Sequence, residues 1–199
     1  MLTQQEMVWR ELLARADHGQ RRFDNLTTLA ADLDMPVSTV HAAIRRPVSM
    51  GAIIPHPGGG GRVVDPTRLL WLWAGARRLD KDLLLSAPSA VSADEVERYL
   101  LDKGVILGGF GAVVARAGAN AISDYDTVVG YIPPGMALPT LPSGPGEIRV
   151  LLLGGDRLIT KYGTVVPRAQ AYTDLFNLPG WTAARFVEAM SREMVADAS

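Results

Sequence analysis

Hydrogen-bonding side chains gather in the segment 37–46, at positions that a helix would carry on its outer side. The outer residues are Ser38, Thr39, His41, Ala42, Arg45 and Arg46. Three aliphatic residues, Val37, Val40 and Ile44, recur at helical spacing and predict the inner side. Hydroxyl, imidazole and guanidinium groups in this arrangement can bond to base edges and phosphate oxygens. The pattern therefore predicts contact with nucleic acid.

Two carboxylates suggest a different chemistry further along the chain. Asp124 and Asp126 precede a predicted strand over 127–132, and alternate strand residues share a face, so both could hold Mg²⁺. With the Gly108-Gly109 pair before a helix, this order resembles a minimal nucleotidyltransferase. The pair is Gly-Gly where that pattern has Gly-Ser, and only Glu147 could supply a third carboxylate. We therefore favour turn residues that cap the strand, with no catalytic residue, metal or cofactor, and keep Mg²⁺-dependent nucleotidyl transfer as the alternative.

The elements around the first group have the order of a helix-turn-helix. A short helix over 26–33 begins after Asn25, a suitable N-cap, and carries the small residue Ala30 where a second helix would cross it. Asp34-Met35-Pro36 predicts a tight turn, because Asp tolerates a left-handed backbone. A third helix begins at Val37 and ends at Gly51. In this arrangement the helix after the turn lies in the DNA major groove.

A hairpin follows, with strands over 52–54 and 62–64 and a flexible tip of four glycines. Such a ribbon is typical of the wing of a winged-helix domain, and Arg62 on the return strand would reach a phosphate or the minor groove. No Lys-Ser/Thr pair follows the glycines, which excludes a P-loop. The alternative is a protein-interaction module of the same shape.

The remaining pattern predicts a second, mixed domain, so the fold class is α+β. Helices are expected over 4–16 and 66–79, with Trp71 and Trp73 packed in the core; a dimer contact is the alternative for these two residues. A Ser, Ala and Pro-rich linker over 80–91 separates domain 1–79 from domain 92–199. The second domain alternates strands and helices, with a strand pair around 158–166 and two helices at its end.

Charge is unevenly divided between these halves. The 199 residues carry a net charge of −1, but residues 1–79 hold ten arginines, no lysine and seven acids. A basic half joined to an acidic half is typical of a nucleic-acid module with an attached domain. The absence of cysteine excludes thiol catalysis and thiolate metal sites. With no signal-like or membrane-spanning apolar run, a soluble cytoplasmic protein is expected.

The C-terminal segment 167–181, Pro-Arg-Ala-Gln-Ala-Tyr-Thr-Asp-Leu-Phe-Asn-Leu-Pro-Gly-Trp, adds a family resemblance. Together with the winged helix it resembles the AbiEi-type antitoxins of type IV toxin-antitoxin systems, whose recurrent helix is matched by Pro167, Gln170, Tyr172, Asp174 and Leu175. The resemblance implies a repressor of its own operon whose second domain opposes a nucleotidyltransferase toxin. From the residues alone, Ala171, Leu175 and Leu178 pack inward, while Asp174 is solvated or caps a neighbour.

Together these patterns predict a sequence-specific regulator that binds double-stranded DNA at its own promoter as a homodimer. The predicted DNA contacts are Ser38, Thr39, His41, Ala42, Arg45, Arg46 and Arg62. A cognate toxin is the expected protein partner, and no membrane partner is expected. The competing hypotheses are a nucleotidyltransferase that uses Asp124 and Asp126 and a purely protein-binding adaptor.

Overall fold

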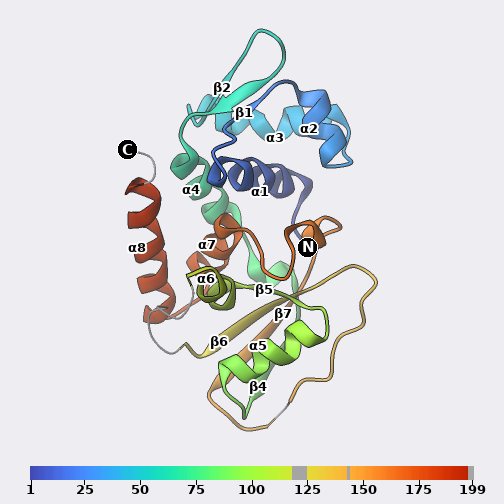
Figure 1. Cartoon of the computed structure of the whole chain (residues 1–199), viewed down its shortest axis with the longest axis vertical. Coiled ribbons are helices and arrows are strands. Elements are labelled where there is room, and N and C mark those ends of the chain that lie inside the picture. The colour runs from blue at the N-terminus through green and yellow to red at the C-terminus, as the bar shows by residue number, and fades with distance from the viewer. Residues whose placement is uncertain (118–124, 143, 197–199) are drawn as a thin grey trace. The chain divides into compact units, whose positions relative to one another are not determined.

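The chain folds into two compact units in a computed structural model that describes residues 1–117, 125–142 and 144–196. The N-terminal unit is Leu2–Ala76, and the C-terminal unit is Arg77–Ser199 together with Met1. The described residues form eight α-helices, a three-stranded antiparallel sheet and a four-stranded mixed sheet (Figure 1). The predicted α+β class is confirmed. No helix in the described part of the chain is both long and apolar enough to cross a bilayer.

The N-terminal unit consists of four helices and a small sheet. Its elements are α1 (Gln4–Asp17), β1 (Arg22–Phe23), α2 (Leu26–Asp32), α3 (Val37–Ser49), β2 (Ile53–Pro55), β3 (Gly61–Val63) and α4 (Pro66–Ala76). The strand order is β1-β3-β2, with β3 antiparallel to both neighbours. The two-residue β1 was not expected from the sequence, because so short a strand leaves no alternating pattern.

Local signals explain where these helices begin and turn. The Asn25 side chain accepts a hydrogen bond from the Thr28 N–H at 2.7 Å, which confirms it as the N-cap of α2. Asp34 has φ 48°, so the predicted left-handed turn between α2 and α3 is confirmed. Pro47 lies inside α3 without ending it, and the helix continues to Ser49 before Gly51 turns the chain at φ 73°.

The core of the N-terminal unit fixes α3 against α1. The Trp9 indole N–H donates to the Ala43 carbonyl at 2.9 Å, and both residues are buried. Trp73 on α4 is fully buried, as predicted, but Trp71 is 56% exposed. The prediction that Trp71 belongs to the core is therefore wrong: residues two positions apart lie on nearly opposite sides of a helix, and only Trp73 faces α1, where its indole N–H donates to Glu6.

The C-terminal unit is a sheet covered by helices on both faces. Its elements are η1 (Leu79–Lys81), β4 (Leu83–Ser89), α5 (Ala93–Asp102), β5 (Ile106–Gly108), α6 (Gly109–Ala117), β6 (Thr127–Ile132), β7 (Ile148–Gly154), η3 (Ile159–Tyr162), α7 (Arg168–Phe176) and α8 (Trp181–Ala196). The strand order is β4-β7-β6-β5, in which only the central β6 and β7 are parallel. Apolar residues of α5 pack on one face, and those of α6 and α7 pack on the other.

Two expectations for this unit are wrong. The predicted linker 80–91 contains β4, which pairs with β7 as the edge strand of the sheet. Its Ser, Ala and Pro content lacks a strand signal, and Pro88 is tolerated because an edge strand has one side without ladder bonds. Residues 158–166 form the 3₁₀ helix η3 and a single parallel bridge between Val165 and Leu107 in place of a strand pair.

Candidate nucleic-acid interface

Helix α3 has one buried side and one polar, accessible side. Val40, Ala43, Ile44 and Pro47 are buried against the unit. Among the predicted contact residues, Ser38, His41, Ala42, Arg45 and Arg46 are exposed and Thr39 is half-buried. The one difference from the expected pattern is Val37, which is 41% exposed, so the buried stripe begins one turn later at Val40.

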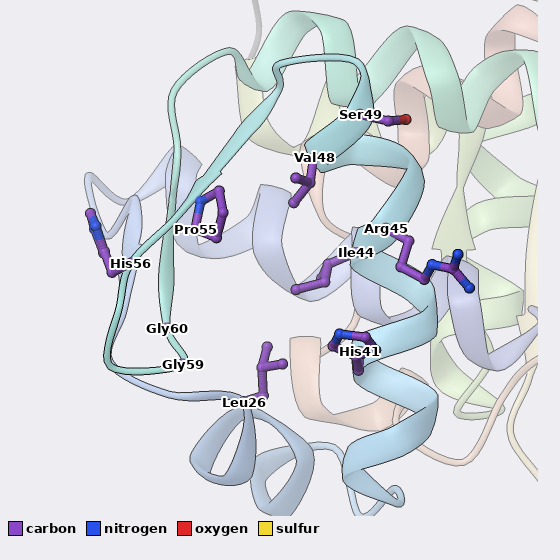
Figure 2. Close-up of a pocket in the computed structure, with 10 residues that line it drawn as sticks. All are labelled: Leu26, His41, Ile44, Arg45, Val48, Ser49, Pro55, His56, Gly59 and Gly60. Carbon is purple, nitrogen blue, oxygen red and sulfur yellow. The ribbon is translucent and has the colours of Figure 1, made fainter.

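A groove separates α3 from the hairpin of β2 and β3 (Figure 2). Its volume is about 400 Å³. The lining residues are Leu26, His41, Ile44, Arg45, Val48, Ser49, Pro55, His56, Gly59 and Gly60. None of them is acidic. In Figure 2 the His41 side chain lies between α3 and the hairpin, whereas the Arg45 guanidinium points away from the hairpin and the His56 ring lies on the side of the hairpin away from α3. His56, a loop residue that is not among the predicted contacts, also borders the groove.

The hairpin tip is held against the start of α2 by a hydrogen bond. The Leu26 N–H donates to the Gly59 carbonyl at 3.1 Å, while a bond within the hairpin, from the His56 N–H to the Gly60 carbonyl at 2.9 Å, closes the tip. A Cβ on Gly60 would lie 2.2 Å from the Asp24 carbonyl oxygen, and one on Gly61 would lie 2.7 Å from the Phe23 ring. In place of the predicted flexible tip, two of the four glycines permit close packing over β1.

The remaining predicted residues divide among other surfaces of the unit. Ser38, Thr39 and Ala42 lie beside Gln4 and Gln5 at the start of α1. Arg46 instead borders a hollow next to Trp71 and Met50, so the structure does not group it with Arg45. Arg62 is exposed on the outer face of β3.

The Gly108-Gly109 pair in the C-terminal unit contacts groups of the protein itself. The nucleotidyltransferase alternative would place a phosphate at this pair. The Gly109 N–H donates to the Asp174 carboxylate at 3.3 Å, so Asp174 of α7 caps the first turn of α6. A Cβ on Gly108 would lie 2.7 Å from the Tyr131 ring and 2.8 Å from Asp174. Of the two expectations for Asp174, capping a neighbour is confirmed, and solvation is wrong because its side chain is fully buried.

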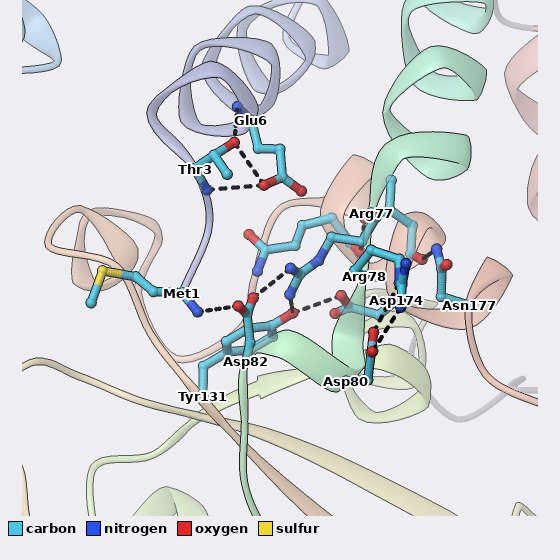
Figure 3. Close-up of polar contacts among 12 residues, drawn as sticks. Met1, Thr3, Glu6, Arg77, Arg78, Asp80, Asp82, Tyr131, Asp174 and Asn177 are labelled. Carbon is cyan, nitrogen blue, oxygen red and sulfur yellow. Dashed lines mark hydrogen bonds and ion pairs between the residues drawn. The ribbon is translucent and has the colours of Figure 1, made fainter.

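Asp174 belongs to a buried polar network (Figure 3). The Tyr131 hydroxyl donates to the Asp174 carboxylate at 2.6 Å and lies 3.3 Å from the Arg77 guanidinium, which also pairs with Asp82. Burial raises the pKa of Asp174 to about 6, against the opposing effects of Arg77 and Tyr131. The network supports the packing of α6 and α7 on the sheet.

The other candidate carboxylates do not form a metal site in the described residues. Asp126 is exposed and accepts a hydrogen bond from the Thr127 hydroxyl at 2.9 Å, whereas Asp124 lies outside the described residues. Glu147 is exposed as well. Within the part of the chain that the structure describes, no group of three or more His, Cys, Asp or Glu residues could hold a metal ion.

A buried carboxyl group that the sequence did not single out lies on α5. Glu97 accepts a hydrogen bond from the Tyr125 hydroxyl at 2.7 Å, and Tyr125 stacks on Phe110 at 4.9 Å between ring centroids. Burial raises the pKa of Glu97 to about 7. The capping box at Ser92 predicts the helix that carries Glu97, but only tertiary packing buries it.

Comparison with known proteins gives no match to a protein-family model, to a curated protein or to a solved structure. The resemblance to AbiEi-type antitoxins has no support from these comparisons and stays a prediction.

Proposed function

We propose that the chain is a sequence-specific regulator that binds double-stranded DNA through its N-terminal unit, used as a winged helix-turn-helix. The observation that carries this proposal is the arrangement around α3: a buried stripe, an exposed polar side, and an acid-free groove leading to the hairpin. In such a complex α3 lies in the major groove and the hairpin lies against the sugar-phosphate backbone.

Each predicted contact then has a physical role. Ser38, His41 and Arg45 are long or polar enough to reach base edges from the exposed side of α3. Arg62 on the hairpin suits a phosphate, which an always-charged guanidinium binds well. Because one such unit reads few base pairs, we propose that two copies bind a site with two halves.

We further propose that the C-terminal unit binds a protein partner, as the antitoxin resemblance implies. Gln170, Tyr172 and Asp174 of the resembling segment are buried and serve its packing. The same segment leaves Phe176 50% exposed and Trp181 66% exposed, and large exposed aromatic side chains are common at protein interfaces. These two residues are the proposed contacts with a nucleotidyltransferase toxin.

Fluorescence anisotropy tests the DNA proposal. Labelled duplexes from the region upstream of the protein's own gene and from a scrambled sequence are titrated at two salt concentrations. We expect tighter binding to the native sequence that persists at the higher salt, because base contacts depend less on counterion release than phosphate contacts do.

The test variant is Arg45→Gln on α3, and the matched control is Arg192→Gln on α8. The Arg192 side chain is 77% exposed and pairs with Glu188. Each removes one positive charge, but only Arg45→Gln should reduce the preference for the native sequence. Equal affinity of the unaltered protein for both duplexes would contradict sequence-specific binding.

A further inference from the structure

Two arginines face each other on the outer surface of the small sheet. Arg22 of β1 lies directly opposite Arg62 of β3, and Ile54 of β2 is the next residue in the same row. Their neighbours Phe23 and Val63 point inward and are buried. The exposed row therefore crosses all three strands, and guanidinium groups occupy two of its three positions.

This arrangement concentrates positive charge with little compensation. Like charges directly opposite each other in an antiparallel pair are destabilising. The acid nearest to Arg22 is Asp24, at 3.8 Å, but both side chains are more than 70% exposed, so the pair contributes little. Within the described residues, no ion pair joins Arg62 to an acid.

We propose that Arg22 and Arg62 together bind one phosphate group of the DNA backbone, which makes Arg22 a further DNA-contacting residue. Opposite residues in an antiparallel pair have Cα atoms roughly 5 Å apart, so both guanidinium groups can converge on one phosphate. The bound anion compensates the repulsion that the free protein carries. Ile54 extends the row with an apolar side chain, 53% exposed, suited to the sugar beside that phosphate.

The fold holds this pair in place before any ligand arrives. The hairpin tip is bonded to the start of α2, and Gly60 and Gly61 pack over β1, so β1 and β3 are joined on both sides of the arginine pair. A preorganised site loses less conformational entropy on binding than a loose loop does. The inference rests on the proposed DNA binding, which it refines to one phosphate site.

The salt dependence of DNA binding measures how many phosphates the protein contacts. Arg22→Gln, Arg62→Gln and the double variant are titrated with the upstream duplex over a range of salt, with Arg192→Gln as the control. The slope of log K against log salt is negative, and each phosphate contact makes it steeper by about 0.9. If the two arginines share one phosphate, the slope of the double variant should be shallower by about 0.9, the change for one phosphate. A change of about twice that size means two separate phosphates and overturns the shared site.

Thermal unfolding without DNA tests the charge pair independently. Removing either arginine should raise the melting temperature of the protein by about 1–4 °C at low salt, since it relieves the repulsion, and the gain should vanish near 0.5 M salt. Each substitution thus stabilises the free protein and weakens its complex with DNA, a combination that mere misfolding cannot produce.

The outcomes separate the two proposals. If the unaltered protein binds the duplex and Arg22→Gln changes neither the affinity for it nor the melting temperature, the shared phosphate site is wrong and DNA binding stands. If the unaltered protein binds no duplex, the proposed function and the phosphate site both fall, even where the melting temperatures reveal the repulsion.

Discussion

The hairpin region of the N-terminal unit and the α6 region of the C-terminal unit contain the same residue types in different structural roles. Both combine a glycine run with arginine side chains. Around α6, Arg77 is buried and paired, and Asp174 caps the helix. Around the hairpin, Arg45 and Arg62 are exposed. Burial and pairing, not residue type, distinguish a packing element from a surface that can bind an external anion.

The glycines teach a related lesson. Gly108 belongs to the pair that was considered as a phosphate site, and Gly60 belongs to the four glycines of the hairpin; at each one a Cβ would collide with the protein's own atoms. The backbone approaches closely at both positions because neighbouring strands and side chains pack there. At these two positions glycine permits close packing, whereas the space around Gly58 and Gly59 is open.

The largest change in stability is expected from Asp174→Ala, on the buried side of this comparison. The substitution removes the acceptor for the Tyr131 hydroxyl and the Gly109 N–H inside a fully buried network. We expect a loss of about 3–5 kcal/mol in the free energy of unfolding, measured by urea denaturation. Asp126→Ala, at an exposed carboxylate of the same unit, should change it by less than about 0.5 kcal/mol. Similar losses in both variants would contradict the structural role given to the network.

The next effect compares two glycines of the hairpin tip. Gly60→Ala places a Cβ against the Asp24 carbonyl and should cost about 3 kcal/mol, whereas the space around Gly58 is open and Gly58→Ala should cost little. The measurement is thermal unfolding of both variants, with DNA affinity as a second readout. A stable Gly60→Ala protein with normal affinity would show that the tip need not pack over β1.

A smaller effect is expected on the exposed side of the comparison. Arg45→Ala should weaken binding to the upstream duplex by about 2 kcal/mol while leaving thermal stability unchanged, because Arg45 is exposed. Arg46→Ala should weaken it less, since Arg46 borders the hollow beside Trp71. The reverse order in an anisotropy titration would move the DNA to the other side of α3.

The smallest effect concerns pH and the buried carboxyl of Glu97. Its pKa is raised from the ordinary 4.5 to about 7, so between these values the folded state binds the proton more readily than the unfolded state does. Stability should therefore fall by about 1–2 kcal/mol as the pH rises from 5 to 8. Glu97→Gln keeps an acceptor for Tyr125 and should remove this part of the pH dependence in parallel melting curves. An identical pH dependence in both proteins would mean that Glu97 is already ionised in the fold.

Sequence reasoning worked where a signal is local. Asn25 and Asp34 act within one turn of the chain, and both were predicted from residue type. It failed where tertiary contacts decide the outcome. The burial of Asp174 depends on Tyr131 and Gly109, which are distant in sequence.

The candidate interface shows the same division. The exposed side of α3 follows from helical periodicity, but the groove and the pairing of Arg22 with Arg62 depend on how the hairpin meets β1. The Arg21-Arg22-Phe23 segment does hold a weak signal, since an aromatic residue beside arginines before a helix cap suits a short strand. Its partner strand cannot be identified from that signal.

The place of β4 also determines how the chain can be cut into fragments. A fragment that begins at residue 92, where the sequence suggests a second domain, would lack the strand that covers the edge of β7. The uncovered Ile148–Gly154 strand is rich in leucine and valine, and an exposed apolar edge invites pairing between molecules and aggregation. Light scattering of fragments 77–199 and 92–199 should show only the shorter one to be insoluble, so a fragment of the C-terminal unit should include β4 and begin no later than Arg77.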